Sequence, residues 1–188
     1  DIEGRILKNL ATWPPEKIYE KLQISHHQSE RLLKEMQQIT IQSAGRWGGE
    51  IENRTFDLKK ALEELIDNYR CGHEKATINL DFQLKDPEIF ADPFHLIHLV
   101  DNLISNALKY AGEKAEIQIS CKQEKTNKLL ISVKDNGPGV STHSRKRIFR
   151  TGFRSNHRHQ NSHGIGLAYV RKIVRQYNGH IQIKSKEN

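Results

Sequence analysis

A helical pattern of apolar residues occupies the first part of the chain. From Pro14 and Pro15 to Ala44, apolar and small side chains recur at spacings of three and four, which is typical of an amphipathic helix. Proline suits the first turn of a helix because its missing N–H would have no partner there. The pattern predicts a helix over 15–44 whose apolar stripe packs against a partner helix, and we interpret the apolar run at 6–10 as the end of that partner. The stripe consists of Ile18, Leu22, Ser25, Ser29, Leu32, Leu33, Met36 and Ile39.

A mixed pattern of helices and strands follows a glycine-rich stretch at 45–49. Capping aspartates, alternating apolar residues and turn signals define its elements. Helices are expected from Asp57 to about Arg70, from Asp92-Pro93 to about Ala111 and from about Gly164 to Gln176, and strands at Thr77–Leu84, Glu116–Ser120, Leu129–Lys134 and Ile181–Lys184. The chain is therefore predicted to contain part of a helical hairpin at 1–45, a linker at 46–56 and an α+β domain at 57–188.

The net charge of +7 arises from 30 Lys and Arg against 23 Asp and Glu, and a basic protein attracts polyanions. Many of the basic residues crowd into the polar stretch 136–163, and a loop of that length inside a compact domain is usually functional. No basic amphipathic helix or aromatic-interleaved basic strand accompanies them, which favours local anion binding over a nucleic-acid surface. These residues are Arg145, Lys146, Arg147, Arg150, Arg154 and Arg158.

Hydropathy and cysteine content indicate the compartment. No stretch reaches the roughly 20 apolar residues that a membrane span needs, and no apolar core of a signal peptide stands at the start. Cys71 and Cys121 form no CxxC pair and are interpreted as structural thiols in a reducing cytoplasm. We expect a soluble cytoplasmic chain, which is compatible with an origin in a membrane receptor.

Three polar residues share one side of the helix expected after Asp92. At 100° per residue, Asn102, Asn106 and Lys109 fall within a narrow arc. Asparagine carbonyl oxygens are neutral hard ligands that suit Mg²⁺, and lysine supplies a point charge for phosphate. Taken alone, however, a solvated helix face is the favoured interpretation. The opposite, apolar side consists of Leu96, Ile97, Val100, Leu103, Ile104, Ala107 and Leu108.

Two glycine motifs lie further along the chain. Asp135 follows an apolar strand and precedes Gly137 and Gly139. A carboxylate at a strand end is a common acceptor for an exocyclic amine, and glycines let the backbone approach a flat base, although a plain turn is the alternative. Glycines that open a helix expose N–H groups toward an anion, although alone they mark a plain helix start. This second motif is His163-Gly164-Ile165-Gly166-Leu167-Ala168.

The order of the three patterns is specific. Asn-x₃-Asn-Ala-x-Lys-Tyr, then Asp-x-Gly-x-Gly, then Gly-x-Gly-Leu resembles the GHKL ATPase superfamily: gyrase, the ninety-kilodalton heat-shock chaperone, histidine kinases and mismatch-repair MutL. The stretch 148–154 resembles the phenylalanine box of sensor histidine kinases, and the helix 15–44 resembles the second helix of their dimerisation and histidine-phosphotransfer hairpin. The resemblance covers about Phe56 to Ser185. It implies a two-layer α/β sandwich, the Bergerat fold, preceded by a long helix of the hairpin.

The resemblance also implies a role for each matching residue. Asn106 would coordinate Mg²⁺, Asn102 would support the metal and the phosphates, and Lys109 would contact phosphate. Asp135 would accept the adenine amino group, and Tyr110 would lie against the ribose or base. Gly137 and Gly139 would form the floor of the site, and Phe149 and Phe153 would anchor a mobile lid. The end of the lid would comprise Gly164, Ile165, Gly166 and Leu167. Arg154 is favoured among the lid arginines that would steady phosphoryl charge. The catalytic residues would be Asn102, Lys109 and Arg154.

The implied reaction is transfer of the γ-phosphoryl group of Mg-ATP to a histidine nitrogen on the first hairpin helix, for relay to a response-regulator aspartate. The implied partners are a response-regulator receiver domain and, through an intact hairpin, a second copy of the chain. No nucleic acid and no membrane contact are expected of this chain, although its parent would be an inner-membrane sensor.

The phosphoacceptor motif of the family is missing from the chain. That motif is a histidine followed by Asp or Glu, a basic residue and proline, whereas His26-His27 is followed by Gln28 and is interpreted as a helix-surface pair. We therefore expect the acceptor to lie upstream of residue 1, and the isolated chain to be unable to autophosphorylate.

The remaining histidines are interpreted without a ligand role. His95 and His98 stand one turn apart at the start of the asparagine helix and are predicted to be helix-surface residues. The histidines of the stretch 157–163 have no fourth ligand or cysteine nearby, so a solvated lid is favoured over a zinc site.

Three other functions remain open. A non-enzymatic regulatory module would bind ATP without catalysis, although the intact Asn106, Asp135 and glycine motifs speak against lost nucleotide binding. A GHKL ATP hydrolase would need a glutamate one turn before the metal-binding asparagine, where this chain has Asn102 beside Asp101. A nucleic-acid binder would rest on charge alone.

Overall fold

The computed structural model of the chain describes residues 13–19, 22, 51–124, 128–145, 147–153 and 165–185. The chain divides into two compact units, Asp1–Gly49 and Glu50–Asn188. In the first unit residues 15–19 are helical, as the proline-started pattern predicts. Almost all of the remaining predicted helix, the apolar run at 6–10, the glycine-rich stretch and the histidine pair lie outside the described residues.

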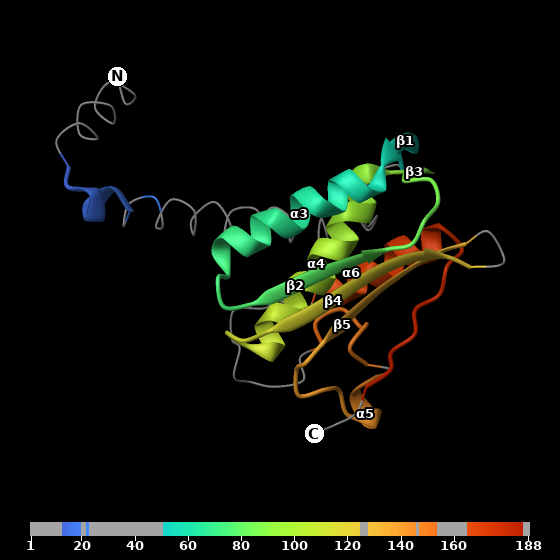
Figure 1. Cartoon of the computed structure of the whole chain (residues 1–188). Helices are drawn as coiled ribbons and strands as arrows, with labels where there is room; N and C mark the ends of the chain where they lie inside the picture. The colour runs from blue at the N-terminus through green and yellow to red at the C-terminus, as the bar shows by residue number, and fades with distance from the viewer. Residues whose placement is uncertain are drawn as a thin grey trace, which may run out of the picture. The chain divides into compact units, whose positions relative to one another are not determined.

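The second unit mixes helices and strands in the predicted order. Three helices and three strands match predicted elements, with ends that differ by up to three residues. None of the helices in the described part of the chain combines the length and hydrophobicity that a membrane span requires. The elements, labelled in Figure 1, are β1 (Arg54–Asp57), α3 (Leu58–Gly72), β2 (Thr77–Phe82), β3 (Glu88–Ala91), α4 (Pro93–Ala111), β4 (Glu116–Gln123), β5 (Leu129–Asp135), α5 (Thr142–Arg145) and α6 (Gly166–Gln176).

The main sheet has the strand order β2-β4-β5. β2 runs parallel to β4, with Ile78 opposite Ile117, whereas β5 runs antiparallel to β4, with Val133 opposite Ile119. A parallel pair needs a long crossover connection, and β3 with α4 supplies it. Figure 1 shows α3, α4 and α6 on one side of this sheet. The second unit is therefore a two-layer α/β sandwich, which confirms the fold class expected from the resemblance.

The hydrophobic core lies between the helices and the sheet. β4 alternates in the way that a half-buried strand requires: Ile117, Ile119 and Cys121 are buried, while Gln118 and Lys122 are exposed. Burial, with a smaller contribution from the charge of Asp81, raises the pKa of the Cys121 thiol to about 11. The thiol is therefore protonated at neutral pH and packs as a small apolar group.

Both predicted aspartate caps are present. Asp57 begins α3, and its Oδ1 accepts a hydrogen bond from the Lys60 N–H at 2.9 Å. Asp92 begins α4 in the same way, because its Oδ1 accepts from the His95 N–H at 3.0 Å. Each cap satisfies one of the backbone donors that the first turn of a helix leaves without an intrahelical partner.

The small ribbon of β1 and β3 was not predicted. The two strands are antiparallel, with Phe56 opposite Ile89. Each has only four residues, which is too short for an alternating pattern to stand out. β1 begins at Arg54, inside the stretch 46–56 that the sequence indicates as a linker.

The strand predicted at Ile181–Lys184 is wrong. These residues alternate as expected, with Ile181 and Ile183 half-buried and Gln182 and Lys184 exposed, but they form no strand. Alternation describes only where side chains point, whereas a strand also needs backbone hydrogen bonds to a neighbour. The next residue, Ser185, bonds instead to Val140 in the loop that follows β5 and to Arg145 in α5.

Asp92 is a buried carboxylate that joins separate segments of the second unit. Besides the cap bond, its Oδ2 accepts a hydrogen bond from the Glu52 N–H at 2.9 Å. Burial by itself would raise the pKa of Asp92, but the backbone donors of His95 and Glu52 and the neighbouring imidazole together hold that pKa below its ordinary value of 3.8. The fold therefore stabilises the ionised form of this side chain.

Replacing Asp92 by asparagine should lower the free energy of unfolding at pH 7 by about 1–3 kcal/mol, because an amide N–H₂ would face the Glu52 N–H donor. The pKa of Asp92 is lower in the folded chain than its ordinary value of 3.8. The ionised carboxylate therefore contributes fully to the free energy of unfolding above pH 3.8, and this contribution is lost as the pH falls through the pKa of the folded state. Urea unfolding between pH 7 and pH 2 measures the free energy of unfolding of the unmodified chain and of Asp92→Asn. The difference between these two free energies should become smaller only below pH 3.8.

Asp57→Asn is the matched control, because asparagine caps a helix as well as aspartate does and this cap is exposed. It should change the free energy of unfolding little across the same pH range. If the free energies of unfolding of Asp92→Asn and of the unmodified chain differ by the same amount down to pH 2, the ionised form of Asp92 does not stabilise the fold.

Candidate functional site

The polar arc predicted on α4 is present. Asn102, Asn106 and Lys109 are half-buried on one side of the helix. The ammonium group of Lys109 lies 5.4 Å from the centre of the Tyr110 ring, close enough for a cation–π contact. The opposite side of α4 is buried, largely as predicted, and includes Leu96, Val100, Ile104, Ala107 and Leu108; Leu99, seven residues before Asn106, is buried as well.

Asn102 brings the asparagine helix and the second glycine motif together. Its Nδ2 donates to the carbonyl of His98 at 2.7 Å, which fixes the orientation of the amide. Its Oδ1 then lies against Gly166, where it occupies the space that a Cβ atom would need. Only glycine permits this approach, so the first turn of α6 and the arc of α4 are in direct contact.

Asp135 and Gly137 place the first glycine motif beside the end of α4. The Oδ1 atom of Asp135 accepts a hydrogen bond from the Gly137 N–H at 2.8 Å. A Cβ atom on Gly137 would lie 2.7 Å from that oxygen and 3.5 Å from the backbone nitrogen of Ala111. Asp135 is exposed, and among the described residues its Oδ2 has no hydrogen-bond donor.

Asn136 locks this motif to the turn between α4 and β4. Its Oδ1 accepts from the Glu116 N–H at 2.9 Å, and its Nδ2 donates to the Lys114 carbonyl at 3.2 Å. The sequence indicated Asn136 only as part of a turn. Its amide instead keeps Asp135 at a fixed position relative to α4.

The loop after Asp135 is held by one of the basic residues. Gly139 has φ +80°, a conformation that favours glycine. Further on, the Arg145 guanidinium donates to the carbonyls of Ser185 at 2.6 Å and of Val140 at 3.2 Å. Arg145 was grouped by sequence with residues for anion binding, but in the structure its guanidinium bonds backbone carbonyls.

The phenylalanine box is partly described. Phe149 and Phe153 are half-buried, and the Arg147 guanidinium lies 4.9 Å from the centre of the Phe153 ring. The short helix α5 interrupts the stretch that was expected to be a loop throughout. Ile165 precedes α6 and is half-buried, as is Leu167. Arg154, Gly164 and the histidines at 157–163 lie outside the described residues.

The prediction that His95 is a surface residue is wrong. Only 6% of His95 is exposed, and its Nδ1 lies 2.7 Å from the hydroxyl oxygen of Tyr169 on α6. The helical period of α4 places His95 on the same side as Asn102, seven residues further on, and α6 packs against this side at both residues. Packing between elements distant in sequence therefore decided the burial, and no local signal in the sequence could have.

Asp101 forms a second cluster that sequence reasoning missed. The Tyr69 hydroxyl donates to its Oδ1 at 2.7 Å, and the His98 Nδ1 lies 3.6 Å from its Oδ2. Burial alone would raise the pKa of Asp101, but the bonds from His98 and Tyr69 together with the charge of His98 hold it below its ordinary value. The spacing of three between His98 and Asp101 was the available signal.

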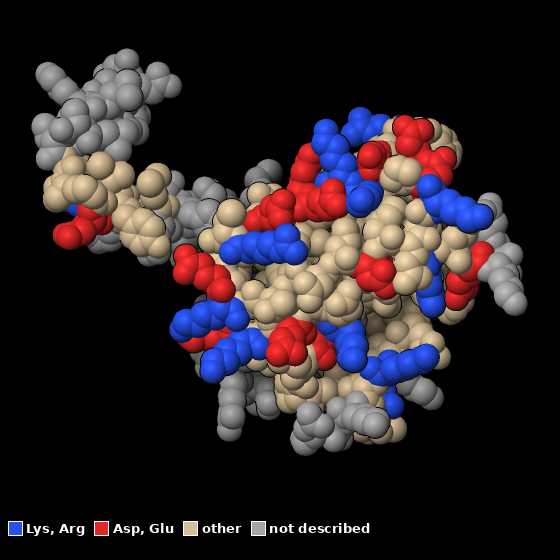
Figure 2. All heavy atoms as spheres, viewed as in Figure 1, with Lys and Arg blue, Asp and Glu red and all other residues tan. Residues whose placement is uncertain are grey.

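Charged side chains of both signs lie on the face of the molecule that Figure 2 presents. Figure 2 shows acidic side chains interspersed among the basic ones on the face that it presents. The basic side chains of this face do not gather into one continuous band.

Comparison with known proteins identifies the domain. Residues 91–188 match the family model described as histidine kinase-, DNA gyrase B- and HSP90-like ATPase. The adaptive-response sensory kinase SasA of a Synechocystis strain is 28% identical over 140 residues, which are 73% of this chain and 37% of that kinase. The chain spans about a third of the length of the curated relatives that it matches.

Solved structures agree with this match. Full-length ShkA in complex with AMPPNP is 26% identical with a TM-score of 0.60, over 70% of this chain and 27% of ShkA. The histidine kinase ThkA in complex with the response regulator TrrA is 22% identical with a TM-score of 0.63, over 95% of this chain and 50% of that chain. The ThkA likeness supports the fold.

The family match covers more than half of the chain and includes α4, Asp135 and α6, the elements that the structure brings together. The chain therefore belongs to the family of histidine kinase-, DNA gyrase B- and HSP90-like ATPases, and its second unit is the ATP-binding domain of that family in the form found in sensor histidine kinases.

Proposed function

We propose that this chain binds Mg-ATP between α4, the end of β5 and the start of α6, and directs the γ-phosphoryl group to a histidine of a kinase hairpin. The observation that carries the proposal is the convergence of three sequence motifs. Asn102 of the first lies against Gly166 of the third, and Gly137 of the second lies beside the last residue of α4. ShkA, which shares 26% identity with this chain, was solved with AMPPNP, and this supports a nucleotide as the ligand.

Asp135 is the residue proposed to recognise adenine. Its Oδ1 is already held by the Gly137 N–H, which orients the carboxylate. Its Oδ2 is then directed to accept from the 6-amino group of adenine. Because the backbone at Gly137 carries no side chain, a flat base can approach the carboxylate closely.

The residues on α4 fit a magnesium ion bound together with phosphates. Asn106 is half-buried on the arc that also holds Asn102 and Lys109, and a carboxamide oxygen is a hard neutral ligand of the kind that Mg²⁺ accepts. Asn106 would hold the ion, and Asn102 would support it from the neighbouring turn. When bound, Mg²⁺ would neutralise charge on the phosphate oxygens.

The protein's own contribution to transfer is positioning and charge. Lys109, one turn from Asn106, would supply a positive charge for the phosphates. The N-terminal turn of α6 presents backbone N–H groups at Gly166, beside Asn102. Arg154 is proposed to steady the phosphoryl group from the lid. These groups would align the γ-phosphoryl for in-line attack by a neutral imidazole nitrogen.

The partners follow from the relatives. We propose that the acceptor histidine belongs to a dimerisation hairpin, that two chains pair through that hairpin, and that the phosphoryl group passes to a response-regulator aspartate. The structure of ThkA with its response regulator TrrA supports a receiver domain as the partner.

The contacts of Asp101 do not favour ATP hydrolysis by the chain itself. A hydrolase of this family would need a carboxylate that activates water near the metal-binding asparagine, and Asp101 is the acidic residue beside Asn102. Both oxygens of Asp101 are already engaged, one by Tyr69 and one by His98. A general base must be within reach of the water whose proton it takes, and these contacts hold Asp101 away from that role.

Asp135→Asn should weaken ATP binding by about 10- to 150-fold, because a hydrogen bond to a charged acceptor contributes about 1.5–3 kcal/mol. The loss for GTP should be smaller, since an asparagine N–H₂ can donate to the 6-oxo group of guanine. Calorimetry with both nucleotides measures the two affinities, and Asp81→Asn, an exposed carboxylate on β2, serves as the control. Equal losses for ATP and GTP would exclude adenine recognition by Asp135.

Gly166→Ala should reduce nucleotide affinity by tenfold or more, because the new Cβ atom would collide with Asn102 and displace its Oδ1. The matched control is Gly72→Ala at the end of α3, where a Cβ atom meets nothing within 4 Å. Nucleotide titrations of both variants, with thermal unfolding to check that each is folded, measure the effect. If the two variants bind nucleotide alike, the contact between Asn102 and Gly166 does not shape the site.

Phosphoryl transfer is tested by incubating the chain with [γ-³²P]ATP, Mg²⁺ and a histidine-bearing hairpin domain from a sensor kinase added in trans. The expected product is acid-labile, alkali-stable label on the hairpin. Asn106→Ala should reduce the initial rate by about two orders of magnitude, the usual cost of removing one group that stabilises transferring charge. Nucleotide binding without any label on the hairpin would favour the non-enzymatic ATP-binding module instead.

A further inference from the structure

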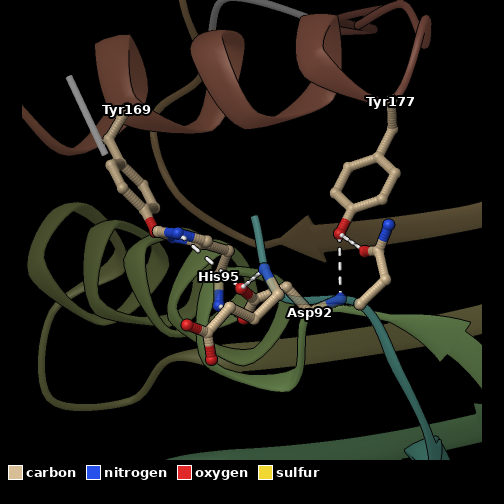
Figure 3. A network of polar contacts seen from close by, with 6 residues as sticks. Asp92, His95, Tyr169 and Tyr177 are labelled. Carbon is tan, nitrogen blue, oxygen red and sulfur yellow. Dashed lines mark hydrogen bonds and ion pairs between the residues drawn. The ribbon is translucent and has the colours of Figure 1, made fainter. Parts of the chain in front are cut away.

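A polar network joins the first residues of the second unit to α4 and α6. Figure 3 shows Tyr169 and Tyr177 reaching from the α6 side toward Asp92 and His95 at the start of α4. We name this network the α4–α6 clamp, and its six members are Glu52, Asn53, Asp92, His95, Tyr169 and Tyr177.

Tyr177 is the branch point of the clamp. Its hydroxyl oxygen accepts a hydrogen bond from the Asp92 N–H at 2.9 Å, while the same hydroxyl donates to Asn53 Oδ1 at 2.8 Å. The neighbouring Glu52 N–H donates to Asp92 Oδ2 at 2.9 Å. Residues 52 and 53 are therefore bonded both to the cap of α4 and to the residue that ends α6.

Tyr169 makes the second connection between the two helices. Its hydroxyl lies 2.7 Å from the Nδ1 atom of the buried His95, and its ring meets that of His98 edge-on at 4.8 Å between centroids. Burial, with the nearby Asp92 charge, raises the pKa of Tyr169 above its ordinary value, so the hydroxyl keeps its proton. A buried polar contact of this kind fixes geometry, because breaking it leaves a group without a partner.

The clamp leads by direct contacts to the candidate nucleotide site. The carbonyl of His98, whose ring packs on Tyr169, accepts the Asn102 amide at 2.7 Å. Asn102 Oδ1 in turn lies against Gly166 at the start of α6. α4 and α6 are thus held together at the clamp and again at the site, and rigid helices carry a displacement at one contact to the other.

We propose that Tyr169 and Tyr177 are positioning residues for nucleotide binding, and that they set the orientation of Asn102 according to the position of residues 52–53. Glu52 and Asn53 stand at the beginning of the second unit, directly after the boundary at residues 49 and 50. A displacement of residues 52–53 therefore acts on both α4 and α6, the two helices that meet at Asn102 and Gly166. The clamp makes nucleotide affinity depend on the segment through which the second unit is connected to the first. This inference rests on the proposed ATP-binding function.

The test is a double-mutant cycle in the full chain with Asn53→Ala and Tyr177→Phe. The dissociation constant for Mg-AMPPNP is measured by calorimetry, and the Asn102 side-chain amide is followed by ¹⁵N NMR without nucleotide. Tyr177→Phe removes both hydrogen bonds of the hydroxyl. It should raise the dissociation constant by about 2- to 10-fold, the equivalent of one of the two bonds, and should shift the Asn102 amide signal. The double variant should bind no more weakly than Tyr177→Phe, because Tyr177→Phe already removes the bond to Asn53.

Tyr69→Phe is the matched control, because it removes a tyrosine hydroxyl that bonds α4 at Asp101 and not residues 52–53. Its fold-change in the dissociation constant should multiply with that of Asn53→Ala in the double variant, because the two changes break different bonds. The proposal is overturned if Asn53→Ala and Tyr177→Phe are folded, bind Mg-AMPPNP as tightly as the unmodified chain and leave the Asn102 amide signal unshifted. If the unmodified chain binds no nucleotide, the proposed function fails, and the Asn102 signal alone then decides for or against the clamp. Should Tyr177→Phe be unfolded, Asn53→Ala at its exposed position provides both readouts.

Discussion

The two-sided character of α4 is the constraint on which the rest of the second unit depends. One side of the helix is buried, with Val100 and Ile104 fully inaccessible, and packs over the sheet. The 3.6-residue period then places Asn102, Asn106 and Lys109 together on another side. Any rotation of α4 that moved the polar arc would expose the apolar side to water, so the hydrophobic effect fixes where the polar groups point.

Short contacts at two glycines turn this fixed helix into a site. At Gly166 the missing side chain leaves room for Asn102, and at Gly137 it leaves room for the Asp135 carboxylate and the backbone of Ala111. The three motifs are distant in sequence, and each is a modest signal alone. Their functional meaning comes from contact between them, which requires the sheet and the helices to be packed first. The clamp at the start of α4 is a second place at which α6 contacts α4, besides the contact between Asn102 and Gly166.

Much of this architecture was predictable from the sequence. The caps at Asp57 and Asp92 were correct because capping is a local interaction within four residues. The course of α4 was correct because its apolar stripe is long and regular. The short strands β1 and β3 were missed because four residues carry little pattern. The strand at Ile181–Lys184 was wrong because pairing with a neighbour is not a property of the segment itself.

By itself the sequence determined the identity and order of the chemical groups, the face of α4 on which they lie and the family to which they belong, because all of these depend on local spacing and residue type. Only the tertiary structure decided that His95 is buried under Tyr169, that Asp101 is held by Tyr69, and that Asn102 meets Gly166. These contacts join residues 32 to 74 positions apart. They exist because burying the apolar faces of the helices against one sheet brings such residues together, and no local pattern encodes which of them will meet.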